Sequence, residues 1–341
     1  MDTVKPELKV CEACVMDTTD PDITFNQYGV CNHCIYAAER ANRRRAQKLE
    51  RPWVVHEMKT SNEHDVLLGL SGGVDSSYCL HLLLENGVKP LTFSLDNGYN
   101  TLQSDSNVRK LVKTAGVTHI PYKLNLKRFK ELQTAFIQSG TANIEIPTDH
   151  VLMAATYELA RKYEIKTIVS GGNWQTEGVM PKAWGYEAKD LHFIKAIGDT
   201  KGLPTISMPQ YLYYRFIKRI KTVNLLEYYG YNREEAIKTL QDKYNYQPYG
   251  EKHGESKFTK WFQDCYLPQK FGYDKRKPHL SSLIHSNQMT RDEALEELKK
   301  PLVCEDRISS DGNKTYKDYP NHEWLWNLLT KLWFTVKLRL R

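Results

Sequence analysis

The residues with the clearest chemical potential form a short segment rich in glycine and serine. It reads Ser71-Gly72-Gly73-Val74-Asp75-Ser76-Ser77 and follows the apolar run 65–70. A buried strand that turns sharply into a helix N-terminus gathers backbone N–H groups at one point, where an anion binds well. The glycines let the backbone approach phosphate oxygens, and the serine hydroxyls add donors. The segment therefore predicts a phosphate-binding loop.

Asp75 is the one acidic residue in this loop. A carboxylate does not face a phosphate without a cation between them, so Asp75 is expected to hold Mg²⁺ or to orient the loop. The segment lacks the lysine of the Gly-x-x-x-x-Gly-Lys-Ser/Thr loop of kinases and GTPases. Its Ser-Gly-Gly-x-Asp-Ser pattern resembles that of the N-type ATP pyrophosphatases, or PP-loop enzymes. The resemblance implies that ATP is split to pyrophosphate and an adenylated intermediate.

Two further segments stand where strands of the same predicted sheet end. Asp96 follows the run 91–95, and Gly171-Gly172-Asn173 follows the run 166–170. Ligands of open parallel sheets bind beyond the carboxyl ends of the strands. These residues are therefore predicted to complete the ATP site, and the PP-loop resemblance implies that Asp96 lies near adenine or ribose.

A second chemical signal comes from cysteine. Of seven cysteines, Cys11, Cys14, Cys31 and Cys34 form two C-x-x-C pairs separated by sixteen residues. Four thiolates satisfy tetrahedral Zn²⁺ and leave no open position, so the spacing predicts a structural zinc ribbon. An iron–sulfur site is the alternative. The other three cysteines are far apart in sequence, and reduced thiols are expected for the chain.

A third block, 249–263, is polar, aromatic and punctuated by glycine. Its residues Lys252-His253-Gly254-Glu255-Ser256 and Phe258-Thr259, with the loop, the cysteine pairs and the 171–174 turn, resemble the N-acetyl sugar amidotransferases. These PP-loop enzymes convert an acetamido group of a sugar into an acetamidino group. The resemblance covers nearly the full length.

The implied chemistry assigns roles within this block. Lys252 is the candidate for the α-phosphate or pyrophosphate, while His253 or Glu255 would handle protons; a solvated loop lysine is the alternative for Lys252. No cysteine lies in a recognisable nucleophile motif, so ammonia is expected from a separate glutaminase subunit. The substrate would be an acetamido sugar, anionic or nucleotide-linked. For Lys270, Lys275 and Arg276 a solvated basic face is favoured over a grip on the sugar.

Two other functions remain open. A PP-loop enzyme that thiolates or otherwise modifies tRNA could also combine a zinc ribbon, this loop and a positive charge. It would need paired cysteines near the ATP, and Cys79, Cys265 and Cys304 form no C-x-x-C pair, although folding could bring them together. A nucleotide sensor that binds ATP without releasing pyrophosphate is the second alternative.

The elements that must position these residues alternate between strand and helix. Strands are predicted at 65–70, 91–95, 117–124 and 166–170, and helices at 76–86, 102–115, 127–138 and from Thr148 or Asp149 to 163. This order predicts a doubly wound, parallel, Rossmann-like α/β sheet. Three parts are expected: a zinc ribbon at 1–40, the α/β domain at 60–204, and a helical part at 205–341. Asn232 and Thr290 are predicted to cap helices in the last part.

Bulk composition fits a globular protein of 341 residues, 40% hydrophobic and 26% charged. The net charge of +7 suits a nucleotide but also nucleic acid, so it decides nothing alone. The N-terminus has no apolar signal core, which predicts a cytoplasmic protein. The segment 324–341 predicts an amphipathic basic helix that docks on the core, with a membrane surface or the glutaminase as alternative contacts.

Overall fold

The computed structural model describes residues 8–46, 51–185, 187–249 and 254–304, and in the last part residues 320, 322, 324, 325 and 327–329. Most of the predicted C-terminal helix therefore lies outside the described residues. Within the described ranges, no helix is both long enough and apolar enough to cross a membrane.

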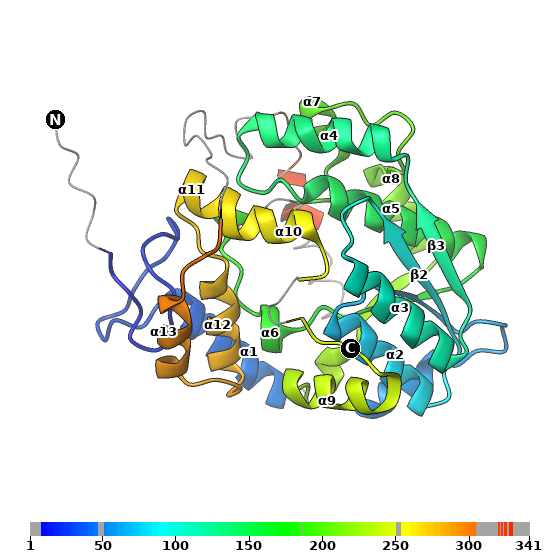
Figure 1. Cartoon of the computed structure of the whole chain (residues 1–341), viewed down its shortest axis with the longest axis horizontal. Coiled ribbons are helices and arrows are strands. Elements are labelled where there is room, and N and C mark those ends of the chain that lie inside the picture. The colour runs from blue at the N-terminus through cyan, green and yellow to red at the C-terminus, as the bar shows by residue number, and fades with distance from the viewer. Residues whose placement is uncertain are drawn as a thin grey trace.

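The centre of the fold is a five-stranded sheet with all strands parallel, in the order β3-β2-β1-β4-β5 (Figure 1). The strands are β1 (Val66–Gly69), β2 (Pro90–Asp96), β3 (His119–Lys123), β4 (Thr167–Ser170) and β5 (Lys221–Asn224). The chain starts in the middle, adds β2 and β3 on one side, and then crosses to β4 on the other. The strand order reverses between β1 and β4, so this is where an open α/β sheet binds its ligand.

Helices cover both faces of the sheet because successive side chains of a strand point to opposite faces. Val66 and Leu68 pack against α2 (Val74–Glu85), α3 (Leu102–Ala115) and α9 (Arg233–Tyr244). Leu67 faces the other way, toward α5 (Ile146–Lys162) and Tyr157. A strand buried on both faces explains the unbroken apolar run that marked β1 in the sequence.

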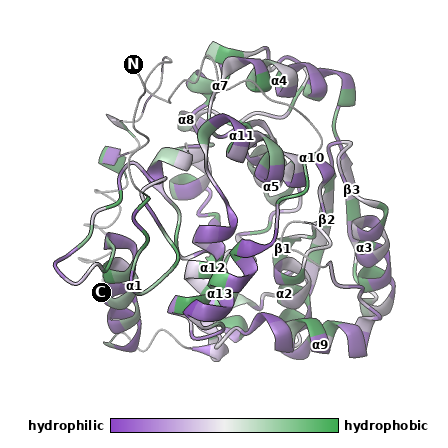
Figure 2. Cartoon of the chain, turned by 60° about the vertical axis from the view of Figure 1, so that its left-hand side comes forward, coloured by the Kyte–Doolittle hydropathy of each residue, from purple (hydrophilic) through white to green (hydrophobic). Residues whose placement is uncertain are grey.

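The outer helices carry both hydrophobic and hydrophilic residues, as Figure 2 shows for α3 and α9. Their starts follow the predicted capping chemistry. Asn232 accepts from two backbone N–H groups of α9, and Thr290 forms a capping box with Glu293 at the start of α13 (Arg291–Lys299). Gly116, in the left-handed conformation, ends α3 as predicted.

Two details differ from the sequence-based expectation. α5 begins three residues early, with Glu145 at the cap position, because Pro147 is preset for the first helical turn. β5 was not predicted at all, since the region beyond 205 read as helical. Its residues include a single apolar side chain, Val223, because an edge strand needs neighbours on one side only.

The remaining helices build a second core beside the sheet. It joins α4 (Leu126–Ser139) and α7 (Leu191–Ile197) to the run formed by α10 (Lys257–Trp261), the π-helical turn η5 (Phe262–Tyr266) and α11 (Leu267–Phe271). The shorter elements are η1 (Pro52–Met58), α6 (Trp174–Glu177), η2 (Lys182–Trp184), α8 (Met208–Leu212), the π-helical turn η3 (Tyr213–Ile217) and η4 (Leu225–Tyr228).

The N-terminal ribbon, with α1 (Asn32–Ala46), packs on α12 (Arg276–His285) and α13, as the left side of Figure 1 shows. Arg291 of α13 donates to the backbone oxygens of Cys11 and Cys14, and the Ser281 hydroxyl accepts from Val15 N at 3.3 Å. The N-terminal ribbon, α12 and α13 thus form one packed unit.

Candidate active site and metal centre

The predicted phosphate loop joins β1 to α2, and its backbone requires glycine. Gly72 has φ +81°, and a Cβ there would lie 2.6 Å from the Ser104 carbonyl oxygen of α3. The buried Tyr246 hydroxyl donates to the Gly72 carbonyl at 2.9 Å. Gly73 is the N-cap of α2. The loop is therefore fixed in one shape at a helix N-terminus, the geometry that suits an anion.

The three loop hydroxyls have different environments. Those of Ser71 and Ser76 lie 3.3 Å apart, and Ser71 is exposed. The Ser77 hydroxyl is buried and donates to the Gly73 carbonyl at 2.6 Å. Ser71 and Ser76 are thus placed to meet a ligand, whereas the Ser77 side chain holds the first turn of α2.

Asp75 is oriented by two donors from outside the loop. The Tyr231 hydroxyl donates to Oδ1, and Asn173 Nδ2 donates to Oδ2 at 3.4 Å. Burial and then the Asp75 charge raise the pKa of Tyr231, so it remains a protonated donor. This favours the orienting role for Asp75 over the metal-binding one.

The turn after β4 lies directly against the phosphate loop. A Cβ on Gly171 would be 3.0 Å from the backbone of Asp75 and Ser76. Gly172 N donates to the Ser170 hydroxyl at 3.1 Å, and Asn173 caps α6. The predicted segments 71–77 and 171–173 therefore meet at the reversal between β1 and β4.

Asp96 ends β2, the strand on the other side of β1. Its Oδ1 accepts from Gly98 N at 3.1 Å, which shapes the turn after the strand. The side chain is half-buried at the same edge of the sheet as the loop.

Glu255 comes from the third block and reaches the phosphate loop. The segment pairs with the turn after β2: Thr101 N donates to Glu255 O at 3.0 Å, and Lys257 N donates to Tyr99 O at 2.9 Å. A Cβ on Gly73 would lie 3.1 Å from Glu255 Oε1. The carboxylate of Glu255, a residue far along the chain, thus lies at the start of α2. The predicted Lys252 and His253 lie outside the described residues.

Two carboxylates that the sequence did not single out for chemistry lie near this block. Burial, with the Asp149 charge, raises the pKa of Glu145 to about 7, although a hydrogen bond from the Thr259 hydroxyl and the charge of Lys275 act against this. Water reaches the Asp149 side chain, yet surrounding protein desolvates its charge and raises its pKa to about 6. The negative charge of Glu255 also raises the pKa of Glu145.

Lys275 connects these carboxylates to a cavity of about 400 Å³. Its walls are both charged and apolar, and His279 at its edge lies 3.3 Å from the Thr176 carbonyl of α6. The lining side chains include the cations Arg233, Lys260, Lys275 and Arg276, the carboxylates Asp264, Asp274 and Glu297, and the apolar residues Leu280, Leu283 and Met289. Lys275 and Arg276 therefore line this cavity, whereas Lys270 is not among its lining residues, and a grip on a sugar by these cations stays a prediction.

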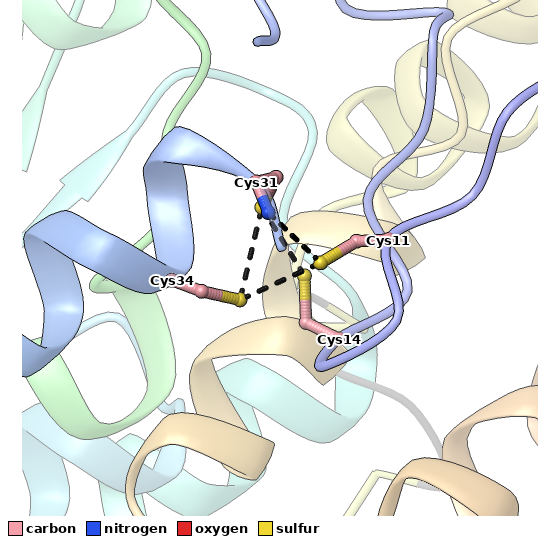
Figure 3. A group of neighbouring side chains, drawn as sticks. All are labelled: Cys11, Cys14, Cys31 and Cys34. Atoms are coloured by element: carbon pink, nitrogen blue, oxygen red, sulfur yellow. Dashed lines mark hydrogen bonds between the residues drawn. The ribbon is translucent and has the colours of Figure 1, made fainter. Parts of the chain in front are cut away.

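The four N-terminal cysteines converge as predicted (Figure 3). Their sulfur atoms all lie within 4.8 Å of one another, and three of the pairs are 3.7 Å apart. Zn–S bonds of about 2.3 Å place the sulfurs of a tetrahedron about 3.8 Å apart. An iron–sulfur cluster inserts several atoms between its ligands and needs a wider cage. The spacing fits a single Zn²⁺ ion.

Hydrogen-bonding groups surround these sulfur atoms, and three of the four cysteines are buried. Backbone N–H groups of Ala13 and Cys31 donate to Cys11 Sγ at 3.3 and 3.2 Å, and His285 Nε2 lies 3.1 Å from Cys34 Sγ. The Cys14 thiol donates to neighbouring cysteine sulfurs, and this donation, together with burial, raises the pKa of Cys14 far above its ordinary value. The four sulfurs cannot all carry charge at this spacing unless a cation joins them. His33, which lies between Cys31 and Cys34, is not part of this cluster and pairs with Asp20 at 2.6 Å.

Cys265 and Cys304 form a disulfide, with Cα atoms 5.3 Å apart. This differs from the expectation of reduced thiols throughout. Cys265 lies in η5, and the packing of segment 301–304 against it unites two residues 39 positions apart. Cys79 is free and buried in α2; burial and the Asp75 charge raise its pKa well above the ordinary value.

Several site residues gave no signal in the sequence. Tyr231, Glu145 and Asp149 lie in unremarkable helix or turn sequence, and their roles arise from contacts with residues more than a hundred positions away or from burial. A search for tyrosines or carboxylates could not have separated them from the many others in the chain.

Residues 255–317 match the family model described as "LPS biosynthesis protein WbpG-like, C-terminal domain". The match begins at Glu255, the residue that reaches the phosphate loop. No curated protein matches the chain.

Three solved structures show distant similarity. The U34-tRNA thiolase NcsA from Methanococcus maripaludis is 15% identical, with 90% of this chain and 94% of that chain covered and a TM-score of 0.37. NMN synthetase from Francisella tularensis is 15% identical over 76% and 97%, with a TM-score of 0.34. NH3-dependent NAD synthetase from Campylobacter jejuni is 16% identical over 62% and 82%, with a TM-score of 0.29. Similarity at this level does not indicate a shared reaction.

Proposed function

We propose that this chain is an ATP-dependent amidotransferase that converts an acetamido group of a sugar into an acetamidino group. The observation that carries the proposal is the position of Glu255 beside Gly73, because it joins the phosphate loop to the block that resembles the sugar amidotransferases. The WbpG-like match over the same block supports a role in saccharide biosynthesis.

The reaction has two steps. An amide is a poor electrophile, so its carbonyl oxygen first attacks the α-phosphorus of ATP, and the bond to pyrophosphate breaks. Ammonia then adds to the carbon of the O-adenylyl imidate, the bond to the AMP oxygen breaks, and the nitrogen loses a proton to give the amidine. The products are the amidine, AMP and pyrophosphate.

The residues of the loop would align ATP for the first step. Ser71, Ser76 and the backbone N–H groups at the start of α2 would hold the β- and γ-phosphates, with Gly171, Gly172, Asn173 and Asp96 completing the site. Mg²⁺, when bound, would neutralise charge on the pyrophosphate.

The second step needs a proton acceptor, because ammonia becomes acidic as it adds to carbon. Glu255 is the candidate placed at the phosphate loop, and His253 stays a prediction. The acceptor sugar is proposed to bind in the cavity that Lys275 and Arg276 line. Ammonia is proposed to come from a separate glutaminase subunit, and the protein to act in the cytoplasm.

The direct test incubates the purified protein with ATP, Mg²⁺, ammonium and a panel of acetamido sugars. Pyrophosphate release that depends on one sugar, with a product one mass unit lighter, is the expected result. Pyrophosphate released only with tRNA would contradict the proposal and favour the tRNA-modifying alternative. Cys79 is buried and Cys265 is bonded to Cys304, so two of these cysteines do lie together in the fold, and the tRNA arm of this assay is what separates the two functions.

Glu255→Gln tests the residue that carries the proposal. The variant keeps the shape of the side chain but cannot accept a proton, so kcat is expected to fall about 10²-fold or more with folding unchanged. The matched control is Glu63→Gln, whose side chain is 89% exposed. Equal loss of kcat in both variants, or in neither, would contradict the assigned role.

A further inference from the structure

A surface patch at the edge of the sheet is both basic and apolar. It consists of residues 161–166, at the end of α5 and the turn after it, and residues 213–221, which form η3 and the start of β5. We call these two segments the basic edge patch. They are joined directly, because Lys221 N donates to Lys166 O at 2.8 Å.

The apolar side chains of the patch point into solvent. Ile217 is 69% exposed and Phe216 is 62% exposed, and Tyr213 and Tyr163 in the same two segments are 44% and 38% exposed. Consecutive large side chains this exposed are unusual on a protein that has a well-packed core elsewhere.

The charge of the patch is strongly one-sided. Its exposed cations are Arg161, Lys162, Lys166, Lys218, Arg219 and Lys221. Glu164 is the single acidic residue in the two segments. Lys218 and Lys162 lie over the rings of Tyr213 and Tyr163, at 5.7 and 5.3 Å from the ring centroids. Two of the cations therefore lie directly over aromatic rings of the patch, and the others are exposed in the same two segments.

The turn that presents Phe216 and Ile217 is anchored to the protein. Arg215 donates to the Ile220 carbonyl at 2.9 Å, and Ile220 N donates to Tyr214 O at 2.9 Å. Tyr214 stacks on Tyr157 of α5 at 5.6 Å, and α8 lies beside α5 in Figure 1. The exposed side chains cannot fold back on the core while these contacts hold the turn.

We infer that the basic edge patch binds the surface of an anionic lipid membrane, with Phe216 and Ile217 entering the headgroup region. Exposed apolar side chains and exposed cations in the same two joined segments combine the two forces that attach proteins to such surfaces. Nucleic acid would use the cations but would gain little from an exposed isoleucine. The patch lies at the amino ends of β4 and β5, whereas the phosphate loop lies at the carboxyl ends. A membrane-bound chain would therefore keep its candidate active site open to water.

Co-sedimentation of the full chain with vesicles tests this inference. Vesicles of phosphatidylcholine alone are compared with vesicles that also contain phosphatidylglycerol. Binding is expected only to the anionic vesicles and is expected to weaken as sodium chloride is raised, because salt screens the charges. Absence of binding, or equal binding to both kinds of vesicle, would overturn the inference.

Two sets of variants assign the binding to the patch. Phe216→Ser with Ile217→Ser, and Lys218→Glu with Lys221→Glu, are each expected to weaken vesicle binding by about tenfold or more. The controls are Tyr28→Ser, which changes an aromatic residue 73% exposed on the ribbon, and Lys127→Glu with Lys238→Glu, which changes exposed lysines elsewhere. Circular dichroism checks that each variant folds.

The outcomes separate lipid from other partners and from the catalytic proposal. Wild-type affinity in both patch variants would overturn the inference and assign lipid binding to another segment. The inference would also be overturned if the wild type bound no lipid and the patch variants instead lost binding to nucleic acid or to an acidic protein. Pyrophosphate release with substrate in solution is expected to be unchanged in every patch variant, so failure of either proposal leaves the other intact.

Discussion

At the residue scale, the candidate site depends on side chains whose ionisation and direction are set by neighbours. The two carboxylate oxygens of Asp75 accept hydrogen bonds from Tyr231 and Asn173. The phosphate loop, the segment before α9 and the turn after β4 therefore meet at this carboxylate. Glu145 is the opposite case, because burial makes its charge unfavourable. Each carboxylate leads to a separate prediction.

Tyr231→Phe removes the hydroxyl that orients Asp75 while keeping the buried ring. We expect kcat/KM for ATP to fall about tenfold, since one hydrogen bond to a charged group contributes about 1.5–3 kcal/mol. Steady-state pyrophosphate release measures this. Tyr229→Phe is the matched control, because that hydroxyl donates to Pro52 O, outside the site. An equal effect of the two changes would show that the loss is a general packing effect.

Glu145→Gln tests the electrostatic cost of this half-buried carboxylate. An acid with a raised pKa in the folded state contributes stability below its unfolded pKa, which is lost as the pH rises through the folded value. The relevant window runs from the ordinary 4.5 to about 7. Thermal unfolding should therefore show the variant more stable than the wild type at pH 8, by on the order of 2 kcal/mol, with little difference at pH 4. Glu131→Gln, on the exposed face of α4, should show no such trend; a parallel pH dependence in the wild type and Glu145→Gln would contradict the assignment.

At the element scale, the site is made by the ends of strands and the starts of helices. β1 ends in the phosphate loop, β4 ends in the 171–173 turn, and the reversal of strand order leaves no crossover helix between them. The contact between Gly171 and Asp75 is close enough to exclude a Cβ. The candidate site therefore depends on close backbone–backbone contacts between these elements as much as on their side chains.

Gly72→Ala tests that dependence on the backbone. A Cβ would meet the Ser104 carbonyl oxygen at 2.6 Å, and φ is +81°, so we expect a loss of about 1–3 kcal/mol of stability and weaker ATP binding. Thermal unfolding and isothermal titration with ATP measure the two effects. Gly230→Ala is the control, because a Cβ there has open space. Wild-type ATP affinity in Gly72→Ala would contradict the proposed loop geometry.

At the scale of the whole molecule, the metal centre connects the N-terminal ribbon to the candidate active site. α1 begins beside Cys31 and extends to Arg44, whose guanidinium lies 5.4 Å from the ring of Trp174. Trp174 opens α6 directly after the 171–173 turn. The ribbon also packs on α12 and α13, so the metal would stabilise a scaffold that reaches the ATP site from outside the sheet.

Removal of the metal is therefore expected to act beyond the ribbon. The purified chain should carry one zinc ion, measured by mass spectrometry. Cys34→Ser should lower the zinc content and reduce Tm by roughly 3–4 °C, as a loss of about 2–3 kcal/mol would do in a chain of this size. Cys79→Ala is the control that should retain the metal. Iron with visible absorbance in the wild type would contradict the zinc assignment.

Local sequence determined the features that local physics controls. The apolar run of β1, the glycines of the loop, the caps at Thr290 and Asn232, and the C-x-x-C pairs each carry their own structural reason within a few residues. The four-strand parallel alternation and the cysteine cluster could therefore be predicted before any contact was known.

Tertiary packing alone decided which distant residues share the site. The sequence gives no local mark that places Glu255 beside Gly73, Tyr231 on Asp75, or Cys265 against Cys304, because each contact joins segments that fold separately. β5 escaped prediction for the same reason, since an edge strand is stabilised by its neighbour β4 more than by its own pattern. Periodicity and capping act over a few residues, whereas burial and charge at a site depend on the whole chain.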